Sequence, residues 1–184
     1  MSDRSFLIDQ IKQHKSNYTE ESSFKNLFLQ LLEEEKCFSR INLSRHITGS
    51  AWITDFDREH IVLLHHKKLN KWLQPGGHAD GNKDIEHVAR KEAMEETGLI
   101  NLHLAHPTLF DIDIHTIPAK NNVPEHDHYD IRYWFLADFN QTPITNHESN
   151  EVKWVNLSEA KKLAEGNKSL MRMIQKTEQH EFIS

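Results

Sequence analysis

Three glutamates, Glu92, Glu95 and Glu96, stand where the apolar stripe of a helix would be expected to continue. Ile85 and Val88 precede them on the same predicted helical face, because residues at i, i+3, i+4 and i+7 share one side of a helix. Carboxylates on a buried face repel one another and are costly to bury without compensation. Mg²⁺ provides such compensation, since it takes oxygen ligands and often binds together with substrate phosphates. The spacing therefore indicates a metal site, with a structural acidic network as the alternative.

A pair of glycines, Gly76 and Gly77, lies just before this helix in the stretch QPGGHADG. Glycine has no Cβ, so its backbone can approach a ligand closely. We expect a carbonyl oxygen of one of the two glycines to reach a metal ion held by the glutamates. The helix itself is predicted to start after Asp84 as its N-cap and to end at Gly98.

Residues 77–99 resemble the Nudix box, G-x5-E-x7-R-E-U-x-E-E-x-G-U, in which U is an aliphatic residue. The matching positions are Gly77, Glu92, Glu95, Glu96, Gly98 and Leu99, with Ala93 at an aliphatic position. Two positions depart from the pattern, because Lys83 replaces the first glutamate and Lys91 replaces the arginine. Lys91 keeps the positive charge and can pair with Glu95 at i+4, but it lacks the bidentate fork of an arginine.

The resemblance implies a Nudix hydrolase that uses Mg²⁺, or Mn²⁺, to cleave a diphosphate linkage in a nucleoside diphosphate derivative. The metal ligands that it implies are Gly76, Glu92, Glu95 and Glu96, and the catalytic residues are Glu95, Glu96 and Glu148. The general base comes from a box glutamate or from a loop acid beyond the box. Glu148 and Glu151 are the loop candidates, and Glu148 is preferred because Glu151 lies at the edge of a predicted strand.

Two other functions stay open at this point. Lys83 and Lys91 are compatible with a catalytically weakened Nudix-fold module that binds nucleotides or regulates a partner. Amphipathic helices near the N-terminus are compatible with binding to a membrane or a partner, although such a pattern more often reflects core packing or a dimer surface. The box does not choose the substrate, because one fold serves many substrates.

Histidines form a second group of candidate site residues. In an extended chain His126 and His128 point to one side, which suits a zinc-like site or contacts with substrate phosphates. The sequence shows no third zinc ligand at a suitable distance. We therefore predict that His78, His126, His128 and Arg132 contact the phosphates or the sugar of the substrate. The alternative is an exposed histidine-rich loop.

The elements that position these residues follow from hydrophobic periodicity. We expect two helices within residues 1–36, with Ser22 or Ser23 capping the second, and loops at 121–128 and 141–150. Strands are predicted on both sides of a tight turn at 55–58, within 71–78 and 106–119, and at 129–139 and 151–157, before one last helix over 158–176. This order predicts an α/β (α+β) fold with a mixed sheet and helices on its faces. The resemblance makes it a Nudix-like α/β/α sandwich, with an N-terminal helical extension at 1–42 and a Nudix domain at 43–184.

Composition limits the class of partner. The chain has 184 residues, 37% of them hydrophobic, and a formal net charge of −6, which disfavours binding to a nucleic acid duplex. We expect no membrane span and no signal peptide, because no apolar run is long enough and the N-terminus has no apolar core. A single cysteine, Cys37, excludes an internal disulfide framework and fits the cytoplasm. The expected partner is a small nucleotide, with a homodimer as a possible assembly.

Overall fold

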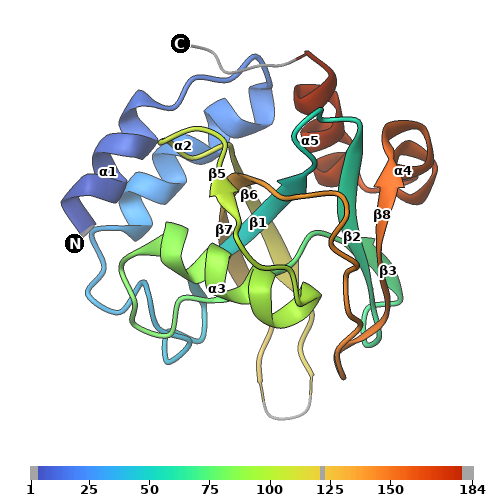
Figure 1. Ribbon diagram of the computed structural model, residues 1–184. Coiled ribbons are helices and arrows are strands. Elements are labelled where there is room, and N and C mark those ends of the chain that lie inside the picture. Colours follow the sequence, from blue (N-terminus) through green and yellow to red (C-terminus); the bar gives the residue numbers. More distant parts are fainter. Residues whose placement is uncertain (1–3, 121–122, 180–184) are drawn as a thin grey trace.

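The structure is a computed structural model that describes residues 4–120 and 123–179. Helices and strands follow one another along the chain as shown in Figure 1. The helices are α1 (Arg4–Gln13), α2 (Thr19–Leu31), α3 (Ile85–Thr97), α4 (Leu157–Leu163) and α5 (Lys168–Gln179). The strands are β1 (Arg45–Thr54), β2 (His60–His66), β3 (Lys71–Leu73), β4 (Gly76–His78), β5 (His103–Leu104), β6 (Asp111–Ile117), β7 (His126–Leu136) and β8 (Ser149–Asn156).

Strand β1 lies at the centre of one mixed sheet. It pairs in parallel with β7 over its whole length, from Arg45 opposite Asp127 to Thr54 opposite Leu136. Strands β2 and β4 pair with β1 in the antiparallel direction. The sheet extends through β5 and β6, which both pair with β7, and through β3 and β8, which both pair with β2. Central β1 thus carries neighbours that come from distant parts of the sequence.

The two faces of the sheet are covered by different helices, because successive strand residues point to opposite sides. One core holds Ile47 and Ile131 of the central strands together with buried residues of α1, α2 and α3. A second core holds Trp52 and Trp134 of the same strands together with residues of α4 and α5. The predicted α/β architecture, with helices on both faces of a mixed sheet, is confirmed.

The N-terminal helices pack against the sheet. The ring of Phe28 on α2 meets Tyr129 of β7 edge to face at a centroid distance of 5.1 Å. The Tyr133 hydroxyl of β7 donates a hydrogen bond to the side-chain carbonyl of Gln10 on α1 at 2.7 Å. Cys37, in the segment after α2, is also fully buried. The apolar stripe of these helices is therefore used for core packing, and none of the described helices has the length and apolarity to span a bilayer.

Three expectations about local structure were wrong. Helix α2 begins earlier than predicted, with Tyr18 at its N-cap, and Ser23 lies inside it and donates to the carbonyl oxygen of Thr19 at 2.9 Å. Residues 126–128 form the first part of β7 and not a loop, because they pair with β6. The last helix is two helices, since the chain turns between α4 and α5 through Gly166 at a φ of 79°.

Candidate active site

Helix α3 carries the glutamates, and its ends are formed as predicted. The Asp84 side chain accepts a hydrogen bond from the His87 backbone N–H at 3.2 Å, and Gly98 ends the helix in the left-handed conformation with a φ of 70°. The apolar part of the helix rests on β1 at Gly49, where an added Cβ would lie 2.9 Å from the Ile85 side chain. This close approach holds α3 against the centre of the sheet, with its acidic end beside β4.

Glu96 is the most deeply placed of the three acids. Its side chain accepts a hydrogen bond from the Gly76 backbone N–H of β4 at 2.8 Å, and the residue is only 8% exposed. Burial raises the pKa of Glu96 to about 7, while the hydrogen bond from Gly76 acts in the opposite direction. The structure thus places Glu96 and Gly76, two of the predicted metal ligands, in direct contact.

Glu92 lies against the second glycine of the pair. An added Cβ at Gly77 would lie 2.5 Å from the Glu92 carboxylate, so any larger residue would displace this side chain from its place. Burial raises the pKa of Glu92, the ammonium group of Lys91 lowers it, and the negative charges of Glu95 and Glu148 raise it further. Each glycine of the pair therefore lies against a box glutamate. Gly76 donates its N–H to Glu96, and the absence of a side chain at Gly77 leaves the space that the Glu92 carboxylate occupies.

Glu95 occupies the exposed edge of the site. Its carboxylate accepts a hydrogen bond from Lys91 at 2.8 Å, as the i+4 spacing predicted, and Lys91 also lies 3.6 Å from Glu92. The second box departure, Lys83, is exposed just before α3. Lys91 therefore still pairs with box carboxylates, as expected of a cation at its position.

Glu148 is exposed in the turn just before β8, and its negative charge raises the pKa of both Glu92 and Glu96. Its backbone carbonyl accepts a hydrogen bond from Lys67 N–H at 3.0 Å, which fixes this end of the loop. Glu151 lies further along β8 and forms an ion pair with Lys153 at 3.4 Å. Glu148 thus interacts electrostatically with two box acids, and its choice over Glu151 as the general base stays a prediction.

This donor set fits a hard divalent cation. Glu92 and Glu96 provide carboxylate oxygens from one face of α3, and burial disfavours their negative charge. The one cation paired with the three box glutamates in the described residues is Lys91, which carries a single positive charge. Oxygen ligands with uncompensated negative charge are the environment that Mg²⁺ prefers.

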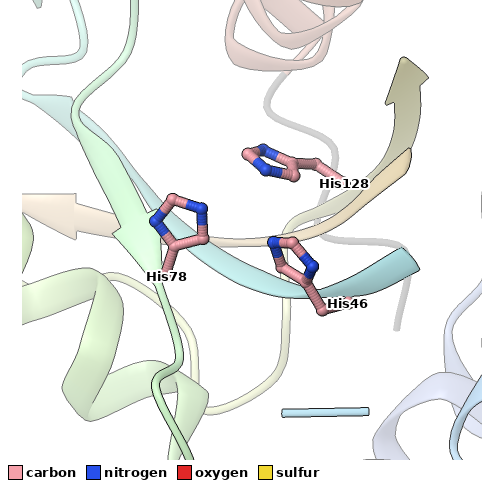
Figure 2. A group of neighbouring side chains, drawn as sticks. All are labelled: His46, His78 and His128. Atoms are coloured by element: carbon pink, nitrogen blue, oxygen red, sulfur yellow. The ribbon is translucent and has the colours of Figure 1, made fainter. Parts of the chain in front are cut away.

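The predicted histidines come together with a fourth that the sequence did not single out, His46 of β1. Figure 2 shows His46, His78 and His128 around a common centre. Their ring centroids are 4.9–5.2 Å apart, and His126 stacks on His46 at 5.2 Å. Burial lowers the pKa of His78 to about 4 and also lowers that of His46 and His128, so these rings are neutral at pH 7.

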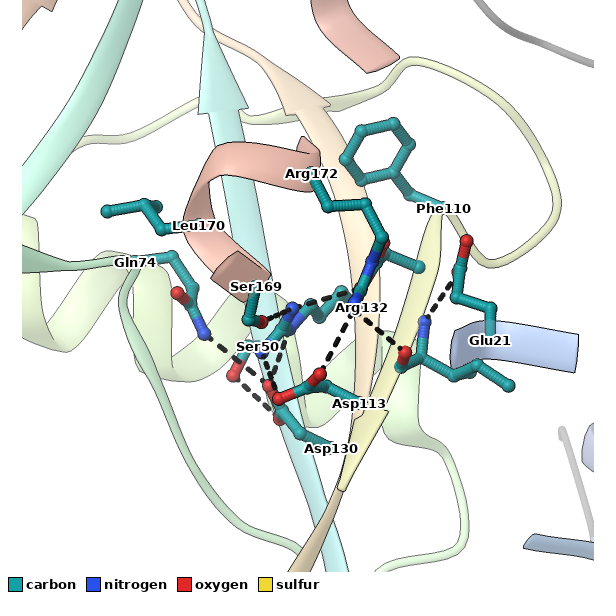
Figure 3. A network of polar contacts seen from close by, with 12 residues as sticks. Glu21, Ser50, Gln74, Phe110, Asp113, Asp130, Arg132, Ser169, Leu170 and Arg172 are labelled. Carbon is teal, nitrogen blue, oxygen red and sulfur yellow. Dashed lines mark hydrogen bonds and ion pairs between the residues drawn. The ribbon is translucent and has the colours of Figure 1, made fainter. Parts of the chain in front are cut away.

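Arg132 lies in a buried ion-pair network on the same face of the sheet as these histidines (Figure 3). Its guanidinium donates to Asp130 at 2.8 Å, to Asp111 at 2.9 Å and to the Ser169 hydroxyl at 2.6 Å. Asp111 also accepts hydrogen bonds from Arg172 and Lys176. Arg132 is only 2% exposed, and its charge is balanced by the carboxylates of this network. A contact between Arg132 and substrate stays a prediction.

A mixed sheet between two helical layers, with the acids of one helix held against a glycine pair, defines the class of fold. The NUDIX domain family model matches residues 44–175, and the chain belongs to the Nudix family of hydrolases. No curated protein sequence matches the chain significantly.

Solved structures agree with this assignment. A Nudix-family hydrolase from Clostridium perfringens is 25% identical with a TM-score of 0.53, and the alignment covers 75% of this chain and 99% of that one. A Caenorhabditis elegans Ap4A hydrolase is 18% identical with a TM-score of 0.56, over 73% and 96% of the two chains. An Escherichia coli dihydroneopterin triphosphate pyrophosphohydrolase is 13% identical with a TM-score of 0.52, over 72% and 95%.

Proposed function

We propose that the protein is a Mg²⁺-dependent hydrolase that cleaves a diphosphate linkage in a nucleoside diphosphate derivative. The observation that carries the proposal is the contact of Glu96 with Gly76 and of Glu92 with Gly77. It brings two carboxylates and a strand backbone together at one end of α3. Mg²⁺ bound there, or Mn²⁺ in its place, would neutralise charge on the non-bridging phosphate oxygens.

Different residues of the site would bind the metal ion and accept the proton. Glu92 and Glu96 would hold the cation, the Gly76 carbonyl would add a neutral ligand, and Glu95 would support the site from its exposed edge. Glu148 accepts a proton from the attacking water as the new oxygen–phosphorus bond forms. The bond between phosphorus and the bridging oxygen then breaks, and the phosphate-containing leaving group departs with the bonding electrons.

Lys83 favours a second candidate function, a nucleotide-binding or regulatory module with weakened catalysis. The family pattern has an acid at this position, where this chain has an exposed lysine. The three intact glutamates, with Glu96 buried and Glu92 partly buried, favour the enzyme. A cytoplasmic location and a homodimer stay predictions.

Turnover separates the two functions. Phosphate-containing products are measured with nucleotide sugars, nucleoside triphosphates, Ap4A and dihydroneopterin triphosphate, with Mg²⁺, with Mn²⁺ and with EDTA. The last two substrates enter the panel because structural neighbours of the chain are named for them. The enzyme hypothesis predicts metal-dependent turnover of at least one substrate.

Two variants on the same helix sharpen the test. Glu96→Gln removes one charge from the site, and we expect it to abolish turnover. Glu86→Gln is the matched control, since Glu86 pairs with Arg90 at 2.6 Å outside the acidic cluster, and we expect it to leave turnover unchanged. Binding of a nucleotide without turnover on any substrate would favour the module.

A further inference from the structure

The histidine cluster of β1, β4 and β7 has the composition of a second metal site, separate from the acids of α3. We propose that His46, His78 and His128 bind one Zn²⁺ ion. The proposal rests on the register of the strands, on the spacing of the ligand nitrogens and on two buried nitrogens without a hydrogen-bond partner among the described residues.

Strand pairing brings the three rings to one side of the sheet. His46 is directly opposite His128 in the parallel pair of β1 and β7, and His78 of β4 is opposite Thr48, two residues further along β1. Alternate residues of a strand share a face, so His46 and Thr48 point the same way. Gly77, one residue before His78, faces the opposite side of the sheet and lies against Glu92. The histidines therefore lie across β4 from the box acids.

The ligand atoms converge. Each imidazole offers a nitrogen, and the three nitrogens lie within 4.8 Å of one another. Zinc–nitrogen bonds are about 2.0–2.1 Å long in tetrahedral sites, which places such ligands roughly 3.4 Å apart. Small side-chain rotations close that difference, and His78 is only partly buried. Three neutral nitrogens favour a borderline transition ion such as Zn²⁺ over Mg²⁺.

Two nitrogens of these three rings have no hydrogen-bond partner among the described residues. The Nε2 atoms of His46 and His128 are buried and form no hydrogen bond with any described residue. Buried polar atoms of this kind are rare in native proteins and require an explanation. The other nitrogen of His46, Nδ1, lies 3.1 Å from the Asn42 carbonyl oxygen. Donation to that carbonyl leaves the Nε2 lone pair free, and metal-binding histidines are commonly oriented in this way.

The surroundings also suit a metal ion. Arg40, whose charge lowers the pKa of His46 and His78, is held by Asp80 in a bidentate pair that balances its charge. His126 stacks on His46 and lies 5.1 Å from His128, and it also lines a surface hollow of about 410 Å³ with Ser44 and Asp127. An ion bound by the three rings would tie β4 to β1 and β7. Since β4 carries Gly76 and Gly77, the zinc site would stiffen the strand that supports the box glutamates.

The test uses the full chain with Glu92→Gln and Glu96→Gln, so that zinc cannot bind to the box acids. After removal of metals with a chelator, Zn²⁺ alone is titrated by calorimetry, and Co²⁺ is followed by its visible ligand-field absorption. We expect one ion per chain. At a hundredfold excess of Zn²⁺ over its Kd, we expect a rise in Tm of roughly 5–10 °C.

Histidine variants in that background identify the ligands. His78→Gln and His128→Gln are expected to weaken Zn²⁺ binding at least about 100-fold and to remove the Tm rise. His87→Gln, at an exposed position of α3, is the matched control and should bind as the background does. If His128→Gln does not fold, the half-buried His78→Gln decides. Absence of Zn²⁺ binding in the background, or unchanged affinity in the foldable ligand variants, would overturn the proposal.

Discussion

Replacing Gly77 with alanine tests the geometry of the active site directly. The added Cβ would lie 2.5 Å from both the carboxyl carbon and one oxygen of Glu92. Ordinary contact needs roughly 3.5 Å, so the carboxylate must move by about 1 Å. A displacement of that size at a catalytic centre costs about 10²-fold in rate. We therefore expect kcat/KM of Gly77→Ala to fall about 100-fold.

The same substitution should leave the fold nearly intact. The atoms that clash belong to the far end of a flexible and partly exposed side chain, which can rotate away. Gly76→Ala is the contrasting variant, because its Cβ would lie 2.9 Å from the Ser50 Cα on β1 and would disturb the strand pairing itself. We expect that variant to lose thermal stability as well as activity.

The assay combines steady-state hydrolysis of the best substrate from the panel with thermal unfolding followed by circular dichroism. Titration of Mg²⁺ measures the metal dependence of each variant. The reasoning predicts that Gly77→Ala keeps the wild-type Tm within a few degrees and needs more Mg²⁺. Wild-type kcat/KM in Gly77→Ala together with an unchanged Mg²⁺ requirement would refute the assignment of Glu92 to the metal site.

Three further predictions concern single acids. In the metal-free protein the pKa of Glu96 is raised from 4.5 to about 7, so the unfolded state loses its proton first as pH rises. The free energy of unfolding should therefore fall between pH 4.5 and 7 by up to about 3 kcal/mol, and chemical denaturation should show that Glu96→Gln removes this fall. Glu148→Gln should lower kcat about 100-fold while Glu151→Gln leaves it unchanged, and equal effects would contradict the assignment of the base. Asp111→Asn should destabilise the fold by about 3–5 kcal/mol in urea, since it disrupts buried ion pairs, whereas Glu34→Gln at the partly exposed pair with Arg45 should cost under about 1 kcal/mol.

The acidic site could be predicted from the sequence because its information is local. Glu92 and Glu96 lie one helical turn apart, and their face is set by the periodicity of a single helix. The caps at Asp84 and Gly98 follow from residue type for the same reason. A family pattern with fixed spacing then connects this helix to Gly77. Contacts between residues within about twenty positions of one another can therefore be predicted from the sequence.

The histidine cluster could not be predicted because it depends on strand register. His46 is separated from His128 by most of the Nudix domain, and they meet because β1 and β7 pair in parallel with His46 opposite His128. Alternation along β7 does place His126, His128 and Arg132 on one face. It does not reveal which strand lies beside them, so His46 and the carboxylate partners of Arg132 were missed.

The parallel pairing of β1 with β7 also determines when the enzyme can become functional during its synthesis. Contacts such as that of Thr48 with Asp130 span 82 residues, and the closure of so long a loop is slow relative to local helix formation. A nascent chain that ends before β7 lacks the neighbour that fixes one edge of β1, even though α3 and all the box glutamates have already been made. Truncated products that retain the complete acidic motif are therefore expected to be inactive and prone to aggregate through the uncovered edge of β1.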